Sequence, residues 1–178
     1  MRKLLLFGFI LVTLIANSQK MLTKTGIITF DGSVPSFEPV KAKNESVTCV
    51  LNASNGQLQS LALVKGFRFK TALMEEHFNE NYIESIKYPK SILRGKLLNF
   101  EMSELTDKPK EYIFKGNIEL HGVKKDLTTK VFLTKTNQGV EITSDFLLNA
   151  SDFDISIPSF VKSKLTDAIK VKVEFTLM

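Results

Sequence analysis

The sequence contains no tryptophan, one cysteine (Cys49) and two histidines (His77 and His121) in 178 residues. A single cysteine excludes an internal disulfide, so an apolar core must hold the folded chain together. The sequence also lacks a Gly-x-Ser-x-Gly elbow, a glycine-rich phosphate loop and a His-Glu-x-x-His pair. These absences disfavour the common serine hydrolases, nucleotide-dependent enzymes and zinc hydrolases, and we expect neither a cofactor nor a metal site.

Runs rich in proline, glycine and serine are absent too, so no linker divides the chain and we expect one domain. The formal charge is +5, and Arg2 and Lys3 account for two of these charges, which leaves +3 for residues 19–178. The lysines are scattered along the chain and form no arginine-rich run, so nucleic acid is not expected as a partner.

The one long apolar run, Leu4 to Ala16, follows Arg2-Lys3 and precedes Asn17-Ser18. A short basic start, an apolar stretch too short to span a bilayer and small residues at positions 16 and 18 are typical of a cleavable secretory signal. We therefore expect a signal peptide over residues 1–18 and a domain over residues 19–178 that is periplasmic or secreted. An uncleaved N-terminal anchor is the alternative.

Apolar and polar residues alternate along most of the remaining chain, which is typical of strands with one buried face. In the last such stretch Ile169, Val171, Val173, Phe175 and Leu177 alternate with polar residues. Further strands are expected over residues 25–31, 47–53, 58–69, 91–100, 112–120, 127–133 and 140–148. Asn55-Gly56, His121-Gly122 and Asn137-Gln138-Gly139 are typical hairpin turns between them. Seven to nine short strands of antiparallel type predict an all-β barrel or sandwich.

Two segments break this alternation. Residues 71–86 carry Met74, Phe78, Tyr82 and Ile86 at a spacing of four, which predicts one inserted helix that ends before Pro89. Residues 152–166 surround Pro158 with apolar side chains and predict a short helical or loop segment before the last strand. On an all-β domain, such segments plug an open end of a barrel or flank its mouth.

Several motifs together resemble the YceI-like family, and they span nearly all of residues 19–178. The motifs are Gly26-Ile27-Ile28-Thr29-Phe30, Ser36-Phe37-Glu38-Pro39-Val40, Lys65-Gly66-Phe67-Arg68-Phe69, the stretch Ala72 to Tyr82, Lys87-Tyr88-Pro89-Lys90, and Gly116 to Lys125 with His121-Gly122-Val123. The resemblance implies an antiparallel, lipocalin-like β-barrel of about eight strands in the bacterial envelope or periplasm. It further implies an elongated apolar cavity for a polyisoprenoid or similar long-chain lipid, with a homodimer as one assembly to test.

A barrel of about eight strands is wide enough either to be filled by its own side chains or to hold one slender ligand. The residues alone leave both readings open, and the resemblance favours the ligand. Fourteen phenylalanines supply apolar surface along the chain. The candidate ligand-binding residues are Phe67, Phe69, Leu73, Met74, His77, Phe78, Tyr82, Phe114, Phe132, Phe146, Phe153 and Phe160.

The two histidines are the main candidates for chemistry. His77 lies between Glu76 and Glu80, four apart on one helix face, but the spacing matches no zinc motif. We expect His77 to hydrogen-bond a loop or a ligand headgroup at the barrel mouth. His121 precedes Gly122 in a turn, where a bond from the imidazole to the backbone is expected.

The sequence therefore predicts an exported binding protein, not an enzyme, that sequesters or carries a long-chain lipid such as an isoprenoid, a quinone or a fatty-acyl species. The first alternative is an envelope enzyme that acts on a lipid with His77 and Glu80 as acid and base. The second is a structural or stress-response envelope protein whose barrel is filled by its own side chains.

Overall fold

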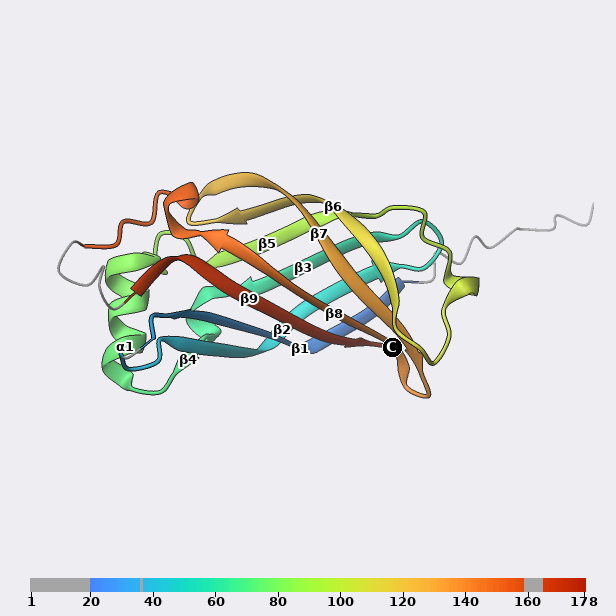
Figure 1. The fold of residues 1–178 in the computed structure, drawn as a ribbon, viewed down its shortest axis with the longest axis horizontal. Coiled ribbons are helices and arrows are strands. Elements are labelled where there is room, and N and C mark those ends of the chain that lie inside the picture. The colour runs from blue at the N-terminus through green and yellow to red at the C-terminus, as the bar shows by residue number, and fades with distance from the viewer. Residues whose placement is uncertain (1–19, 36, 159–164) are drawn as a thin grey trace, which may run out of the picture.

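The computed structural model describes residues 20–35, 37–158 and 165–178, so the expected signal peptide and Phe160 lie outside the described residues. Most of the described chain is β-strand (Figure 1). The strands are β1 (Lys20–Ser33), β2 (Lys41–Asn52), β3 (Gln57–Leu63), β4 (Arg68–Phe69), β5 (Lys90–Leu97), β6 (Lys110–Leu120), β7 (Val123–Thr136), β8 (Gly139–Asn149) and β9 (Leu165–Leu177). None of the described helices is long and apolar enough to cross a membrane.

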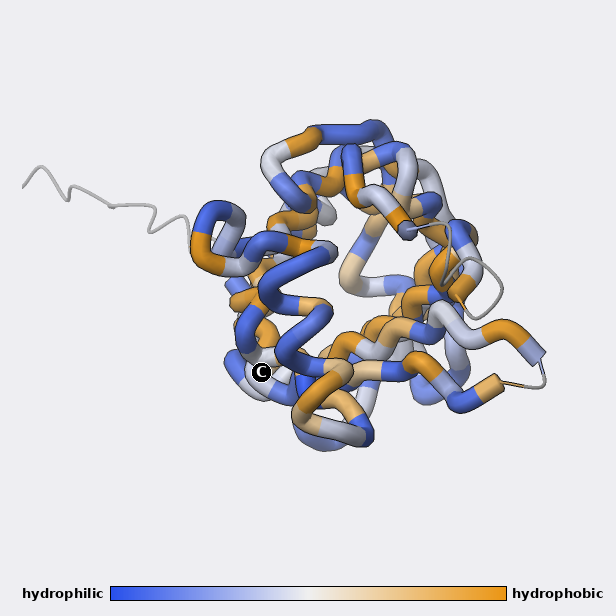
Figure 2. Tube along the Cα trace, turned by 90° about the vertical axis from the view of Figure 1, so that its left-hand side faces the viewer, coloured by the Kyte–Doolittle hydropathy of each residue, from blue (hydrophilic) through white to orange (hydrophobic). Residues whose placement is uncertain are grey.

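The strands form a closed antiparallel barrel. Neighbours follow the order β1-β9-β8-β7-β6-β5-β3-β2, and β2 pairs with β1 again to close a ring of eight strands. Strand β4 pairs with β2 at Ala42↔Phe69, beyond the end of β3. The prediction of a lipocalin-like barrel of about eight strands is confirmed, and Figure 2 views this ring along its axis.

The alternation of side chains accounts for the inside and outside of the wall. On β9, Val171, Val173, Phe175 and Leu177 are buried, and Lys172 between them forms an exposed ion pair with Glu174. The predicted turns lie where expected. Gly56 adopts φ 73°, and His121 and Gly122 adopt φ 51° and 76°, which is the left-handed conformation that tight hairpins require.

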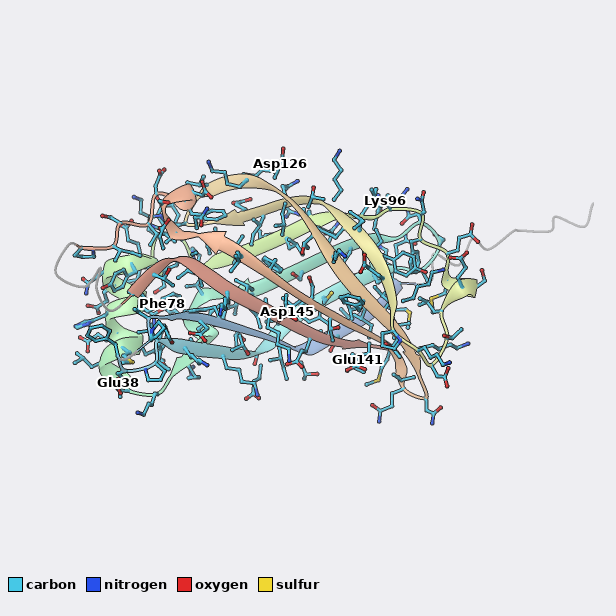
Figure 3. All side chains as sticks on the ribbon, viewed as in Figure 1. Glu38, Phe78, Lys96, Asp126, Glu141 and Asp145 are labelled. Carbon is cyan, nitrogen blue, oxygen red and sulfur yellow. The ribbon has the colours of Figure 1, made fainter. Side chains whose placement is uncertain are left out.

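The two ends of the barrel differ. One end, here called the helix end, carries the β1–β2 loop, the insertion between β3 and β5, the β6–β7 turn and the segment between β8 and β9. The other, here called the closed end, carries the β2–β3 and β7–β8 turns and the C-terminus, where Met178 N donates to Leu22 O at 3.2 Å. Figure 3 shows Glu38 and Phe78 at the helix end.

The insertion contains α1 (Ala72–His77), which continues as a π-helical segment, η2 (Phe78–Tyr82). Thr71 caps the helix by accepting a hydrogen bond from Met74 N at 3.3 Å. The helix is shorter than the predicted 71–86, because Glu84 turns to φ 45° and ends the helical path. Short 3₁₀ turns occur at η1 (Val64–Gly66), η3 (Met102–Glu104) and η4 (Ala150–Phe153).

Side chains fill the barrel toward the closed end. The rings of Phe114 and Phe175 are almost fully buried there. Phe114 lies against Gly95 and Gly116, and a Cβ atom on these glycines would lie 2.5 Å and 2.8 Å from its ring. Phe175 covers Gly26 in the same way, at 2.5 Å. Because the three glycines leave room for these rings, the barrel interior is closed at this level.

Candidate functional site

A cavity of about 320 Å³ occupies the barrel interior toward the helix end. Inward residues of β1, β3, β5, β6, β8 and β9 form its walls. The insertion between β3 and β5 contributes Met74, Phe78 and Tyr82, and the segment after β8 contributes Phe153 and Ile155. Its volume lies at the lower end of the range for pockets that hold small molecules.

Four phenylalanines, here called the Phe cluster, join the wall to the helix: Phe30, Phe67, Phe69 and Phe78. The Phe78 ring centroid lies 5.0 Å from that of Phe69 and 5.4 Å from that of Phe30. Phe30 also lies 5.2 Å from Phe67. Such distances are typical of favourable aromatic packing. The cluster therefore positions the helix across the end of the cavity.

Polar contacts hold the same helix from outside. Arg68 Nη1 donates to Glu75 Oε1 at 2.7 Å, and Phe69 N donates to the other oxygen of this carboxylate at 3.3 Å. Asn79 Nδ2 donates to Glu75 O at 2.8 Å. Glu75 thus connects α1 to β4, which explains why an acidic residue stands in the first turn of this helix.

The cavity lining is almost wholly apolar. The polar side chains on it are Ser60, His77, Tyr82, Ser91 and Asn149. No Lys, Arg, Asp or Glu lines the cavity within the described ranges. The interior therefore provides burial for apolar groups and no compensating charge for an ionised one.

His121 connects three segments at the helix end. Its Nδ1 donates to Phe153 O at 2.9 Å, and its Nε2 lies 2.9 Å from Glu84 Oε2. The Tyr88 ring packs edge-on against the imidazole at 4.5 Å between centroids. The expected bond from imidazole to backbone is present, and the side chain is 9% exposed. His121 therefore fixes the β6–β7 turn against both segments that border the cavity.

A model of the YceI-like domain matches residues 16–177. That match covers almost the entire chain, including every strand of the barrel and the cavity walls. The chain belongs to the YceI-like family.

Solved structures share this YceI-like fold. A polyisoprenoid binding domain from Saccharophagus degradans, implicated in plant cell wall breakdown, matches with a TM-score of 0.74 at 12% identity over 87% of this chain and 95% of that one. Burkholderia cenocepacia BcnA matches with a TM-score of 0.68 at 12% identity, over 84% of this chain and 94% of BcnA. The Campylobacter jejuni YCEI protein matches with a TM-score of 0.64 at 15% identity, over 82% of this chain and 88% of that protein. No curated protein matches the sequence.

The structure brings many of the sequence-predicted residues together in the YceI-like cavity. Those that line it are Phe67, Phe69, Met74, His77, Phe78, Tyr82, Phe146 and Phe153. They come from both inserted segments and from β4 and β8. Their contact with a ligand stays a prediction.

Three predicted residues lie elsewhere. Leu73 is 60% exposed, because it precedes the helix face formed by Met74, Phe78 and Tyr82. Phe114 points inward but belongs to the filled part of the barrel. Phe132 is 38% exposed, because it alternates with the inward Val131 and Leu133 on β7. The alternation of Phe132 with Val131 and Leu133 is visible in the sequence, and it already places Phe132 on the outer face.

Sequence reasoning missed Phe30, Ser60, Ala62, Leu93 and Leu148, all of which line the cavity. Each occupies an inward position of a strand, so alternation could have identified their face. Their height along the barrel axis could not be read from the sequence, because it depends on how the strands are staggered against one another.

His77 and Glu80 form no acid-base pair in the structure. His77 is exposed at the edge of the cavity, and the described residues give it no hydrogen bond to Glu80. Across the described part of the chain, no three His, Cys, Asp or Glu side chains gather as metal ligands.

Proposed function

We propose that this YceI-like protein binds a long-chain apolar lipid, polyisoprenoid-like in character, and sequesters or carries it inside the barrel. The observation that supports this most directly is the cavity, whose walls are apolar and carry no charged side chain among the described residues. Each methylene group that enters it contributes about 0.8 kcal/mol through removal from water. Affinity can therefore accumulate along a chain without recognition of a headgroup.

One solved relative supports the same class of ligand. The Saccharophagus degradans domain is described as polyisoprenoid binding and shares the barrel over most of its length. An isoprenoid, a quinone or a fatty-acyl chain are the ligands we propose to test. We further propose export to the periplasm or the exterior, as the first eighteen residues predict.

Ligand release requires part of the wall to move. The helix α1–η2 has no fully buried residue and borders the cavity through one face. We assign it the role of the movable element. Catalysis forms no part of this proposal, because no described acid-base pair faces the cavity.

The chain has no tryptophan, so an introduced one reports on its own site. We would prepare Leu148→Trp, on the cavity wall, and Leu147→Trp, whose parent side chain is 60% exposed on the outer face. Titration with a brominated polyprenyl or fatty-acyl lipid should quench the Leu148→Trp variant saturably. The Leu147→Trp variant should show little quenching, because its indole would lie in solvent.

Native mass spectrometry of the protein from its own host, followed by lipid extraction, identifies the natural ligand and reports whether copies pair. A stoichiometric lipid supports the proposal. An empty protein that also shows no quenching in Leu148→Trp with any offered lipid would overturn it, in favour of a barrel that needs no ligand.

A further inference from the structure

Ser60 is the deepest polar side chain of the cavity. It lies on β3 in register with Leu93 of β5, which is in register with Ile118 of β6. All three line the cavity. The next inward position on β3 is Leu58, in register with Gly95, where the Phe114 ring closes the barrel. Ser60 therefore stands at the floor of the cavity, one inward position above the filled part.

The Ser60 hydroxyl has no partner in the described part of the chain, although the residue is only 7% exposed. Two other buried polar side chains that face inward, Ser144 and Asn44, are paired. Ser144 Oγ donates to Lys130 O at 2.6 Å, and Asn44 Nδ2 donates to Leu63 O at 3.0 Å. A hydroxyl buried without a partner is unfavourable, because it loses the hydrogen bonds that it makes in water.

The surroundings of Ser60 restrict what can satisfy it. A serine hydroxyl both donates and accepts, so it pairs with a hydroxyl, a carbonyl or an ether oxygen. The lining within the described ranges offers no cationic side chain to balance a carboxylate or phosphate at this depth. An ionised group at the floor would be buried without a counter-charge, which is strongly unfavourable.

We propose that Ser60 hydrogen-bonds a neutral oxygen, a hydroxyl or a carbonyl, on the inner end of the bound lipid. This inference rests on the proposed function and specifies its ligand as a lipid whose buried end carries an uncharged oxygen. The apolar chain then extends past the Phe cluster toward the helix end. Ser60 is thus the specificity residue of the cavity, and the apolar walls supply most of the affinity.

The test compares 1-dodecanol with tridecane, which have equal numbers of non-hydrogen atoms. Each displaces the fluorescent probe N-phenyl-1-naphthylamine from the mature protein, and the displacement yields a Kd. In Ser60→Ala the Kd for dodecanol should rise about fivefold to tenfold, because the alcohol loses its partner. The Kd for tridecane should change by less than about twofold. The difference between the two ligands isolates the hydrogen bond from changes in packing.

Two further variants control for structure. Ser144→Ala removes a buried, inward hydroxyl that is already paired and does not line the cavity, so it should leave the ratio of the two Kd values unchanged. Ser60→Cys keeps the size of the side chain and weakens the hydrogen bond, so it should follow Ser60→Ala. Ser60→Ala itself should unfold at the same or a higher temperature than the parent, since no native bond is lost.

The outcomes separate this inference from the proposed function. If both ligands bind the parent protein and Ser60→Ala changes their Kd values equally, the role of Ser60 is overturned and lipid binding stands. If neither ligand displaces the probe and no polyprenyl lipid binds, the proposed function falls and this inference with it.

Discussion

Cys49 faces the filled interior from β2 and has no measurable exposure. Burial raises the pKa of its thiol to about 12. Because only the thiolate reacts readily, we predict that the folded protein does not react with Ellman's reagent at pH 8. The chain unfolded in guanidinium should react at once and release one equivalent of thionitrobenzoate per chain. Absorbance at 412 nm checks both.

Linkage gives the sign of the pH effect. The folded thiol ionises at a higher pH than the unfolded one, so its contribution to stability is complete below about pH 9 and declines as the pH rises toward about 12. Labelling of the folded protein at the rate of a free thiol would show that the β2 wall opens locally.

His121 is the second residue whose environment makes a prediction. Its replacement in His121→Ala leaves Phe153 O without its partner, and it removes the contacts to Glu84 Oε2 and to the Tyr88 ring. We expect a loss of about 2–4 kcal/mol in the free energy of unfolding. Urea unfolding followed by circular dichroism measures it.

His77→Ala is the matched control, because His77 is exposed on the helix and makes no described hydrogen bond. Its effect on stability should stay within about 0.5 kcal/mol. Equal effects of the two substitutions would contradict the assignment of His121 as the residue that fixes the helix end.

At the scale of elements, α1–η2 differs from the strands that it covers. None of its residues is buried, whereas β6 contributes Tyr112, Phe114 and Ile118 to the interior. Local openings are easiest where few apolar contacts are lost. We predict that amides of residues 72–82 exchange with deuterium much faster than those of β6. Hydrogen exchange with mass spectrometry tests this.

A bound lipid should slow exchange in residues 72–82, because it adds contacts to Met74, Phe78 and Tyr82. Exchange in β6 near the closed end serves as the internal control. If the helix exchanges as slowly as β6 in the ligand-free protein, it is not the movable element, and ligand entry must use another path.

The inserted helix shows what the spacing of apolar residues predicts and what it does not. A spacing of four placed Met74, Phe78 and Tyr82 on one face correctly, since all three line the cavity. The predicted end of the helix was too late, because the sequence contains no strong stop signal between Tyr82 and Pro89. The chain turns at Glu84, whose carboxylate lies 2.9 Å from Nε2 of His121, a residue that is distant in sequence.

For the molecule as a whole, the contrast between the filled and hollow parts of the barrel predicts a contrast in stability. Leu133 is fully buried in the filled part, whereas Leu148 is partly buried beside the cavity. Leu133→Ala should lower the free energy of unfolding by about 3–4 kcal/mol, because packed neighbours lose contacts and a new void forms. Leu148→Ala should lower the free energy of unfolding by about 1–2 kcal/mol, because one side of this leucine already faces the cavity.

Chemical unfolding of both variants measures the difference, with the parent protein as reference. A saturating lipid should increase the loss of unfolding free energy caused by Leu148→Ala, because the bound ligand makes contacts with the Leu148 side chain that alanine cannot make. Equal costs in the absence of ligand would indicate that the cavity collapses around its walls.

The sequence by itself determined the class of the fold. Period-two alternation identified the strands, and glycine-containing turns separated them, because a half-buried strand and a tight hairpin each impose local requirements on side chains and φ angles. The resemblance to the YceI-like family added the closed barrel and the order of its parts. Eight of the twelve candidate residues, among them Phe67, Phe78 and Phe153, line the cavity.

Only the tertiary structure decided where the barrel is filled and where it is hollow. Phe114 and Phe146 are both inward phenylalanines of antiparallel strands, yet the first closes the interior and the second lines the cavity. The difference arises from the stagger of β5 against β6, which brings Gly95 beside Phe114, whereas Gly116 is the next inward position after Phe114 on β6 itself. The same stagger leaves the Ser60 hydroxyl at the floor of the cavity. Such heights depend on contacts across the whole barrel, and local sequence patterns do not specify them.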